Sequence, residues 1–91
     1  MQQITPSQLS EWAHAQAQRP VLLDVREGWE VQTACARPAE LDFVHMPMQT
    51  IPARLHELDR NRPVACLCHH GGRSMQVAHF LASHGFEVVN I

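Results

Sequence analysis

The sequence predicts a three-layer α/β domain in which a central, mostly parallel sheet carries helices on both faces. Short apolar runs alternate along the chain with segments of helical spacing, and this order requires crossover connections between parallel strands. The first run is nearly continuous, as expected of a strand buried on both faces. The predicted strands cover residues 21–25, 43–46, 64–68 and 87–91. A chain of 91 residues has the length of one domain, and we assign residues 1–91 to it.

The first half of the chain begins with a predicted helix. Thr5 is a suitable N-cap and Pro6 then occupies the first helical position. Apolar residues continue at helical spacing until Pro20 ends the segment. After the first strand, residues 27–34 are predicted to form a short helix. Residues 35–42 combine a proline with mixed charge, which indicates a loop.

The second half repeats the alternation. Pro47 stops the strand predicted at residues 43–46, and residues 50–58 place their apolar side chains on one helical face. The last helix is predicted over residues 74–84. Gly85 follows it and suits the left-handed position just after a helix C-terminus.

Composition excludes several classes of function. The net charge is −2, and the seven basic residues are all arginines scattered along the chain, so we expect no binding to nucleic acid. No apolar run approaches the roughly 20 residues of a membrane span. Residues 1–20 lack a basic start followed by an apolar core, so we expect no signal peptide. Three cysteines are an odd number, which favours a reducing compartment and hence a cytoplasmic location.

The most informative stretch joins the third predicted strand to the last helix. It reads Cys68-His69-His70-Gly71-Gly72-Arg73-Ser74. In open α/β sheets the ligand site lies outside the carboxyl ends of the strands, where Cys68 falls. Backbone amides and a helix N-terminus aimed at a thiol lower its pKa, so the pattern predicts a thiolate nucleophile.

The residues after the cysteine fit an anion cradle. Gly71 and Gly72 permit positive φ and let backbone amides turn inward. Arg73 can offer paired donors to an anion or stabilise the loop, and Ser74 can cap the helix and add a donor. Four residues separate Cys68 from the arginine, one fewer than in a phosphatase loop. The smaller cradle should suit a terminal sulfur better than a tetrahedral phosphate.

The Cys-x-x-Gly-x-Arg-Ser pattern of this stretch resembles that of the rhodanese-like (single-domain sulfurtransferase) family. Three further segments are similar to that family in the expected order. They are Leu22-Leu23-Asp24-Val25-Arg26-Glu27, His45-Met46-Pro47-Met48 with the helix at residues 51–58, and Gly85-Phe86-Glu87-Val88-Val89-Asn90-Ile91. The resemblance implies a rhodanese-like fold over nearly the whole chain.

The resemblance also implies a function. Cys68 would take sulfane sulfur from thiosulfate or a persulfide and pass it to a thiophilic acceptor, such as a protein thiol, with no cofactor. Amides from His69 to Arg73 would stabilise the persulfide anion. The family makes Arg26 a candidate contact for the substrate, although the residues themselves favour an ion pair between Arg26 and Asp24.

The chain departs from the family pattern in two places. The Gly-Gly-x-x-x-Trp segment and closing helix that usually follow the strand at residues 87–91 are missing from these 91 residues, and whether further residues follow Ile91 stays open. Residues 32–42 differ from the usual Gly-His-Ile-Pro-Gly-Ala stretch, and the donor-side wall of the pocket should differ with them.

Other interpretations remain open at this point. A rhodanese-fold binding module without turnover is the main alternative, and a phosphatase or arsenate reductase is a third class. Four potential zinc ligands occur together, but adjacent histidines rarely converge on one ion, so we expect no metal; the four are Cys66, Cys68, His69 and His70. His69 and His70 either line the pocket mouth or face water. Cys66 is expected in the core, with a resolving-thiol role still open, and Cys35 has no assigned role.

Overall fold

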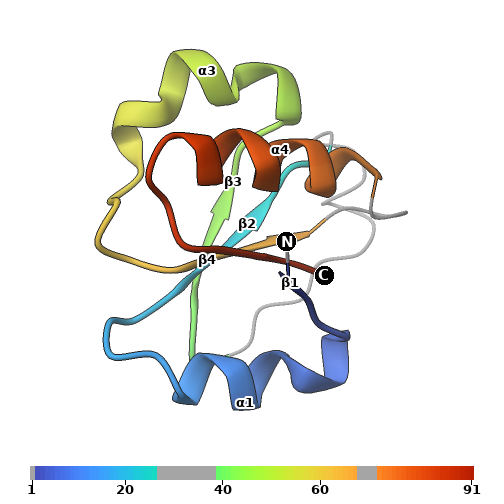
Figure 1. The fold of residues 1–91 in the computed structure, drawn as a ribbon, viewed down its shortest axis with the longest axis vertical. Coiled ribbons are helices and arrows are strands. Elements are labelled where there is room, and N and C mark those ends of the chain that lie inside the picture. Colours follow the sequence, from blue (N-terminus) through green and yellow to red (C-terminus); the bar gives the residue numbers. More distant parts are fainter. Residues whose placement is uncertain (1, 27–38, 68–71) are drawn as a thin grey trace.

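The computed structural model describes residues 2–26, 39–67 and 72–91. Within these ranges, a single sheet runs in the order β1-β5-β4-β2-β3 and every pairing is parallel. The strands are β1 (Gln2–Gln3), β2 (Val21–Asp24), β3 (Asp42–His45), β4 (Val64–Leu67) and β5 (Val88–Asn90). The helices are α1 (Leu9–His14), α3 (Ile51–Arg54) and α4 (Gly72–Ser83). Figure 1 shows α1 on one side of the sheet and α3 and α4 on the other, which confirms the predicted class.

The sheet separates two apolar cores, and successive side chains of β2 point alternately into one core and the other. Leu23 is fully buried against the layer of α3 and α4, whereas Leu22, also fully buried, faces α1. Burial of each leucine stabilises the fold by about 1.5–3 kcal/mol relative to exposure. The nearly continuous apolar run therefore predicted the central position of β2 correctly.

The first two described helices, α1 and α3, are shorter than their sequence patterns predict and are flanked by tighter turns. A 3₁₀ turn at Pro6–Gln8 precedes α1, and the Thr5 N–H donates to Gln8 Oε1 at 2.9 Å. The helix predicted at residues 50–58 is divided, since 3₁₀ turns flank the four residues of α3 on both sides. Short helices tighten in this way because most of their backbone groups belong to a terminal turn. Among the described helices, none has the length and apolar character to cross a bilayer.

One strand was not predicted from the sequence. The two residues of β1 pair in parallel with β5, and the Ile4 N–H continues this pairing to the Asn90 carbonyl at 2.9 Å. Both β1 residues are exposed glutamines, so no apolar alternation marks them. The pairing joins the two ends of the described chain at one edge of the sheet (Figure 1).

The end of α4 offers a test of backbone strain. Gly85 has φ +88°, and the Phe86 N–H returns to the Leu81 carbonyl at 3.1 Å. A Cβ in this conformation is strained, so we expect Gly85→Ala to lower the free energy of unfolding by about 1–2 kcal/mol. Gly72→Ala is the matched control, because a Cβ on this helical residue meets no atom of the described residues within 4 Å. Urea unfolding of both variants checks this prediction, and equal losses would contradict it.

A second test lies at the amino end of the sheet, where two arginines share one carboxylate. Arg19 Nε donates to Asp42 Oδ1 at 2.8 Å, and Arg62 Nη2 donates to Oδ2 of the same side chain. The hydrogen bond from Arg19, followed by that from Arg62, lowers the pKa of Asp42 below its ordinary value of 3.8. A lowered pKa stabilises the fold above the ordinary value, and this contribution disappears as the pH falls through the lowered one.

We therefore expect Asp42→Asn to be less stable than the wild type at neutral pH, and the difference to narrow below about pH 4. Chemical unfolding between pH 6 and pH 3 measures it. Glu57→Gln is the comparison variant. The first cause of the lowered pKa of this exposed carboxylate is a hydrogen bond from a single arginine, Arg54. A difference for Asp42→Asn that stays constant or widens on acidification would show that the carboxylate does not act through its charge.

Candidate active site

The carboxyl ends of three neighbouring strands meet at one edge of the sheet. Asp24 at the end of β2 is in register with His45 of β3 and Leu67 of β4. From Leu67 the chain passes through residues 68–71 to Gly72, the first residue of α4. The predicted nucleophile Cys68 and its neighbours His69, His70 and Gly71 lie outside the described residues, as do residues 27–38. The described part of the site is therefore the frame of this loop, by which we mean the strand ends and the first turn of α4 that flank it.

Backbone hydrogen bonds continue past the strand ends and hold this frame together. The Val25 N–H donates to the Leu67 carbonyl at 3.1 Å, so the turn after β2 is tied to the last residue of β4. The Met46 N–H donates to the Asp24 carbonyl at 3.0 Å, and the Met48 N–H to the Val25 carbonyl at 3.1 Å. These bonds fix the point at which the chain leaves β4 for the loop.

A buried ion pair lies directly beneath this edge. Asp24 is fully buried and Arg26 is 7% exposed. Arg26 Nη2 donates to Asp24 Oδ2 at 2.7 Å and its Nε to Oδ1 at 2.9 Å, while its backbone N–H also reaches Oδ1 at 3.0 Å. The carboxylate thus closes a tight turn after the strand and neutralises the arginine in the same contact. The ion pair expected from the sequence is confirmed, and a role for Arg26 toward substrate stays a prediction.

His45 secures the same turn from the neighbouring strand. Its Nε2 lies 2.7 Å from the Arg26 carbonyl oxygen. A carbonyl only accepts, so Nε2 carries the hydrogen in this contact. Sequence analysis placed His45 in the strand predicted at residues 43–46 but did not identify its partner. The signal available in the sequence was the place of His45 at the end of the next predicted strand after the Asp-x-Arg segment.

The first turn of α4 brings two predicted site residues to the edge. Arg73 is half-buried and Ser74 is fully buried. The helix begins at Gly72, two residues earlier than predicted, so Ser74 lies inside the first turn and the expected N-cap role for it is wrong. Gly72 lies in α4 and is not among the described glycines with positive φ, so the freedom that this residue type permits is not used there. Arg73 lies in the same turn, and its role toward an anion stays a prediction.

Two buried polar positions lie deeper, between the sheet and α4. Cys66 is fully buried in the core, as expected. Asn90 of β5 is in register with it and is 2% exposed. Among the described residues, Asn90 Oδ1 has no hydrogen-bond partner. Sequence analysis placed Asn90 in a strand but did not predict that its amide is buried.

Comparison with known proteins identifies the family of this chain. The model of the rhodanese-like domain family matches residues 5–91. The chain belongs to the rhodanese-like domain family.

Individual relatives agree with this assignment. The chain is 37% identical over 70 residues to YtwF of Bacillus subtilis, which is named a sulfurtransferase, covering 77% of this chain and 64% of that protein. It is 33% identical over 87 residues to the thiosulfate sulfurtransferase GlpE of Glaesserella parasuis, covering 96% of this chain and 75% of GlpE. Among solved structures, protein SSP1007 of Staphylococcus saprophyticus is 30% identical with a TM-score of 0.82, over 100% of this chain and 86% of the other.

The rhodanese-like chain is shorter than several of these relatives. It spans 64% of the length of YtwF and 64% of a sulfurtransferase of Allochromatium vinosum, to which it is 32% identical over 78% of its own length. The family and fold are therefore established by sequence and structure together. The reaction is a separate question, which the site chemistry must answer.

Proposed function

We propose that this rhodanese-like domain is a sulfurtransferase that moves sulfane sulfur from thiosulfate or a persulfide donor to a thiophilic acceptor through a persulfide on Cys68. The observation that carries the proposal is the frame around the loop. The chain leaves β4 at the carboxyl edge of the sheet and returns four residues later into the first turn of α4, which bears Arg73 and Ser74. Relatives named sulfurtransferases, YtwF and GlpE, support it.

The proposed reaction has two displacement steps. The Cys68 thiolate attacks the outer sulfur of thiosulfate, the sulfur–sulfur bond of the donor breaks, and sulfite leaves with the bonding electrons. The enzyme then holds Cys68-S-S⁻. An acceptor nucleophile attacks the outer sulfur, and Cys68 leaves as a thiolate, so cyanide becomes thiocyanate. A protein thiol acceptor would become a persulfide in the same way.

The loop and its flanks would serve both steps by holding negative charge. Amides from His69 through Gly71 and Gly72 to Arg73 would surround the outer sulfur, as an oxyanion hole surrounds oxygen. The Arg73 guanidinium would attract the anionic donor. A further contact to the donor from Arg26 or Ser74 belongs to this proposal, as does a role for His69 and His70 at the mouth.

The direct test is the intact mass of the protein after incubation with thiosulfate. We expect the wild type to gain one sulfur atom and to lose it again when cyanide is added. Cys68→Ser should gain none, whereas Cys35→Ser, which also removes one thiol, should load normally. A wild type that stays at its original mass under these conditions would overturn the proposal and favour the binding module without turnover.

Two further elements of the proposal are compartment and competing chemistry. The odd number of cysteines suits a reducing compartment such as the cytoplasm, where a thiol nucleophile stays reduced. Hydrolysis of an aryl phosphate should be negligible beside sulfur transfer, because the loop is one residue shorter than a phosphatase loop. Comparable rates for the two reactions would instead favour the phosphatase class.

A further inference from the structure

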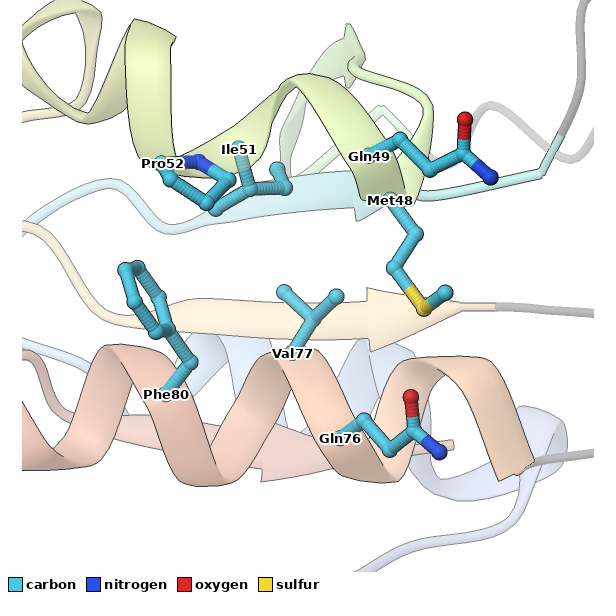
Figure 2. A pocket seen from close by; sticks show the side chains of 7 residues that line it. All are labelled: Met48, Gln49, Ile51, Pro52, Gln76, Val77 and Phe80. Atoms are coloured by element: carbon cyan, nitrogen blue, oxygen red, sulfur yellow. The ribbon is translucent and has the colours of Figure 1, made fainter.

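A small apolar groove lies between α4 and the segment that contains α3 (Figure 2). Its volume is about 200 Å³. The lining residues are Met48, Gln49, Ile51, Pro52, Gln76, Val77 and Phe80. The groove is smaller than the roughly 300–1,000 Å³ of a site for a drug-sized ligand, so it suits a smaller organic group.

The walls of the groove determine what can enter. Ile51 and Val77 are buried and form its apolar floor, and the partly buried Phe80 closes one end. Among the described residues that line the groove, none carries a charged side chain. Figure 2 shows the amides of Gln49 and Gln76 at the opposite end, beside Met48 and toward the tip of β4. An inorganic dianion finds no counter-charge here, whereas an alkyl chain with a polar terminus is matched on both counts.

One end of the groove lies near the carboxyl edge of the sheet, since Figure 2 shows Met48 beside the tip of β4. The Met48 N–H is bonded to the Val25 carbonyl at 3.1 Å, so one wall is attached to the turn that contains Arg26. The other wall is the start of α4, where Gln76 is four residues beyond Gly72. Four residues of α-helix advance about 6 Å, which places this end of the groove close to the start of α4.

We propose that the groove binds the alkyl portion of a small organic thiol that accepts sulfur from the Cys68 persulfide. This inference rests on the proposed function and names its acceptor class. The acceptor thiolate attacks the outer sulfur of Cys68-S-S⁻, the bond between the two sulfurs breaks, and Cys68 leaves as a thiolate. The product is the organic persulfide, and no oxidant or reductant is consumed.

The test uses a homologous series of acceptors on protein already loaded by thiosulfate. The series is mercaptoethanol, mercaptopropanol, mercaptobutanol and mercaptohexanol. The measured quantity is the second-order rate constant for loss of the extra sulfur, followed by intact mass. We expect this constant to rise about two- to threefold with each added methylene, as burial of alkyl surface requires.

A pair of variants assigns the effect to the groove. Gln76→Trp places a bulky ring at the groove and should remove the dependence on chain length while leaving loading by thiosulfate unchanged. His79→Trp puts the same side chain at an exposed position of α4 that does not line the groove, and it should keep the dependence. Normal loading by thiosulfate shows that each variant is folded.

The outcomes separate this inference from the proposed function. Failure of the wild type to load overturns both. Normal loading with rate constants that do not vary along the series overturns the groove alone, and so does a dependence on chain length that survives in Gln76→Trp. If Gln76→Trp instead slows transfer to reduced thioredoxin while small thiols react as before, the groove serves a protein partner and the proposal is wrong.

Discussion

Replacing Cys68 by alanine should abolish sulfur transfer and leave the unfolding transition of the domain in place. The proposed mechanism routes every sulfur atom through a covalent intermediate on this thiol, so removal of the nucleophile should reduce the rate on the order of 10⁴-fold or more. We expect the fold to tolerate the substitution, because the described residues alone form two extensive apolar cores.

The measurement pairs a thiocyanate assay with thermal unfolding. Cys66→Ala is the informative comparison, since Cys66 is fully buried in the core two residues earlier. That variant should retain sulfur transfer but lose stability, because a buried side chain is shortened. Transfer that persists in Cys68→Ala, or that is lost in Cys66→Ala with the fold intact, would place the nucleophile elsewhere.

The same site predicts a more reactive thiol than an ordinary cysteine. An unperturbed thiol has a pKa of about 8.5. Backbone amides, the start of α4 and the Arg73 guanidinium all favour the thiolate, so alkylation of Cys68 should be half-maximal at a clearly lower pH. Arg73→Ala should move that midpoint back upward. A wild-type midpoint near 8.5 would mean that the thiol is not activated.

The elements predicted correctly were those whose burial dictates their pattern. The run at residues 21–25 is apolar on both faces because β2 lies at the centre of two cores, and the structure buries Val21 through Val25 completely or nearly so. Gly85 was predicted from its place after a helix, and its positive φ confirms the reason. The Asp24–Arg26 pair followed from two opposite charges at the end of a buried strand.

Several features that the sequence did not predict have a common physical origin, because they depend on neighbours distant in sequence. The pairing of β1 depends on backbone groups of β5, nearly ninety residues away, and two exposed glutamines carry no apolar signal. The burial of Ser74 and Asn90 depends on how α4 packs on the sheet. The groove beside Met48 likewise arises from the spacing between two helical segments, which no local pattern records.

The second large effect should come from breaking the pair beneath the active-site edge. Asp24→Asn leaves the Arg26 guanidinium, which is 7% exposed, beside a neutral amide. Removing one partner of a buried ion pair is strongly destabilising, so we expect a loss of about 3–5 kcal/mol in the free energy of unfolding. That loss is a large share of the free energy of unfolding of a typical domain, which is about 5–15 kcal/mol. Unfolding should therefore be measured in sucrose, which favours the folded state.

A double-mutant cycle distinguishes the ion pair from loss of packing. Arg26→Met removes the charge but keeps an unbranched apolar side chain, and it should cost a similar amount because the Asp24 carboxylate is then buried alone. The double variant Asp24→Asn/Arg26→Met should lose less than the sum of the two single losses. Additive losses would mean that the two side chains act independently, contrary to their contact at 2.7 Å.

The same variants separate the structural role of Arg26 from contact with the donor. If Arg26 only holds the turn, Arg26→Met and Asp24→Asn should reduce sulfur transfer to the same extent, because both release the turn that supports the Leu67 carbonyl. If its guanidinium also meets thiosulfate, Arg26→Met should raise the KM for thiosulfate further than Asp24→Asn does. The three hydrogen bonds that its side chain makes to the Asp24 carboxylate favour the first result, whereas the second result would support the contact with the donor that the proposed function includes.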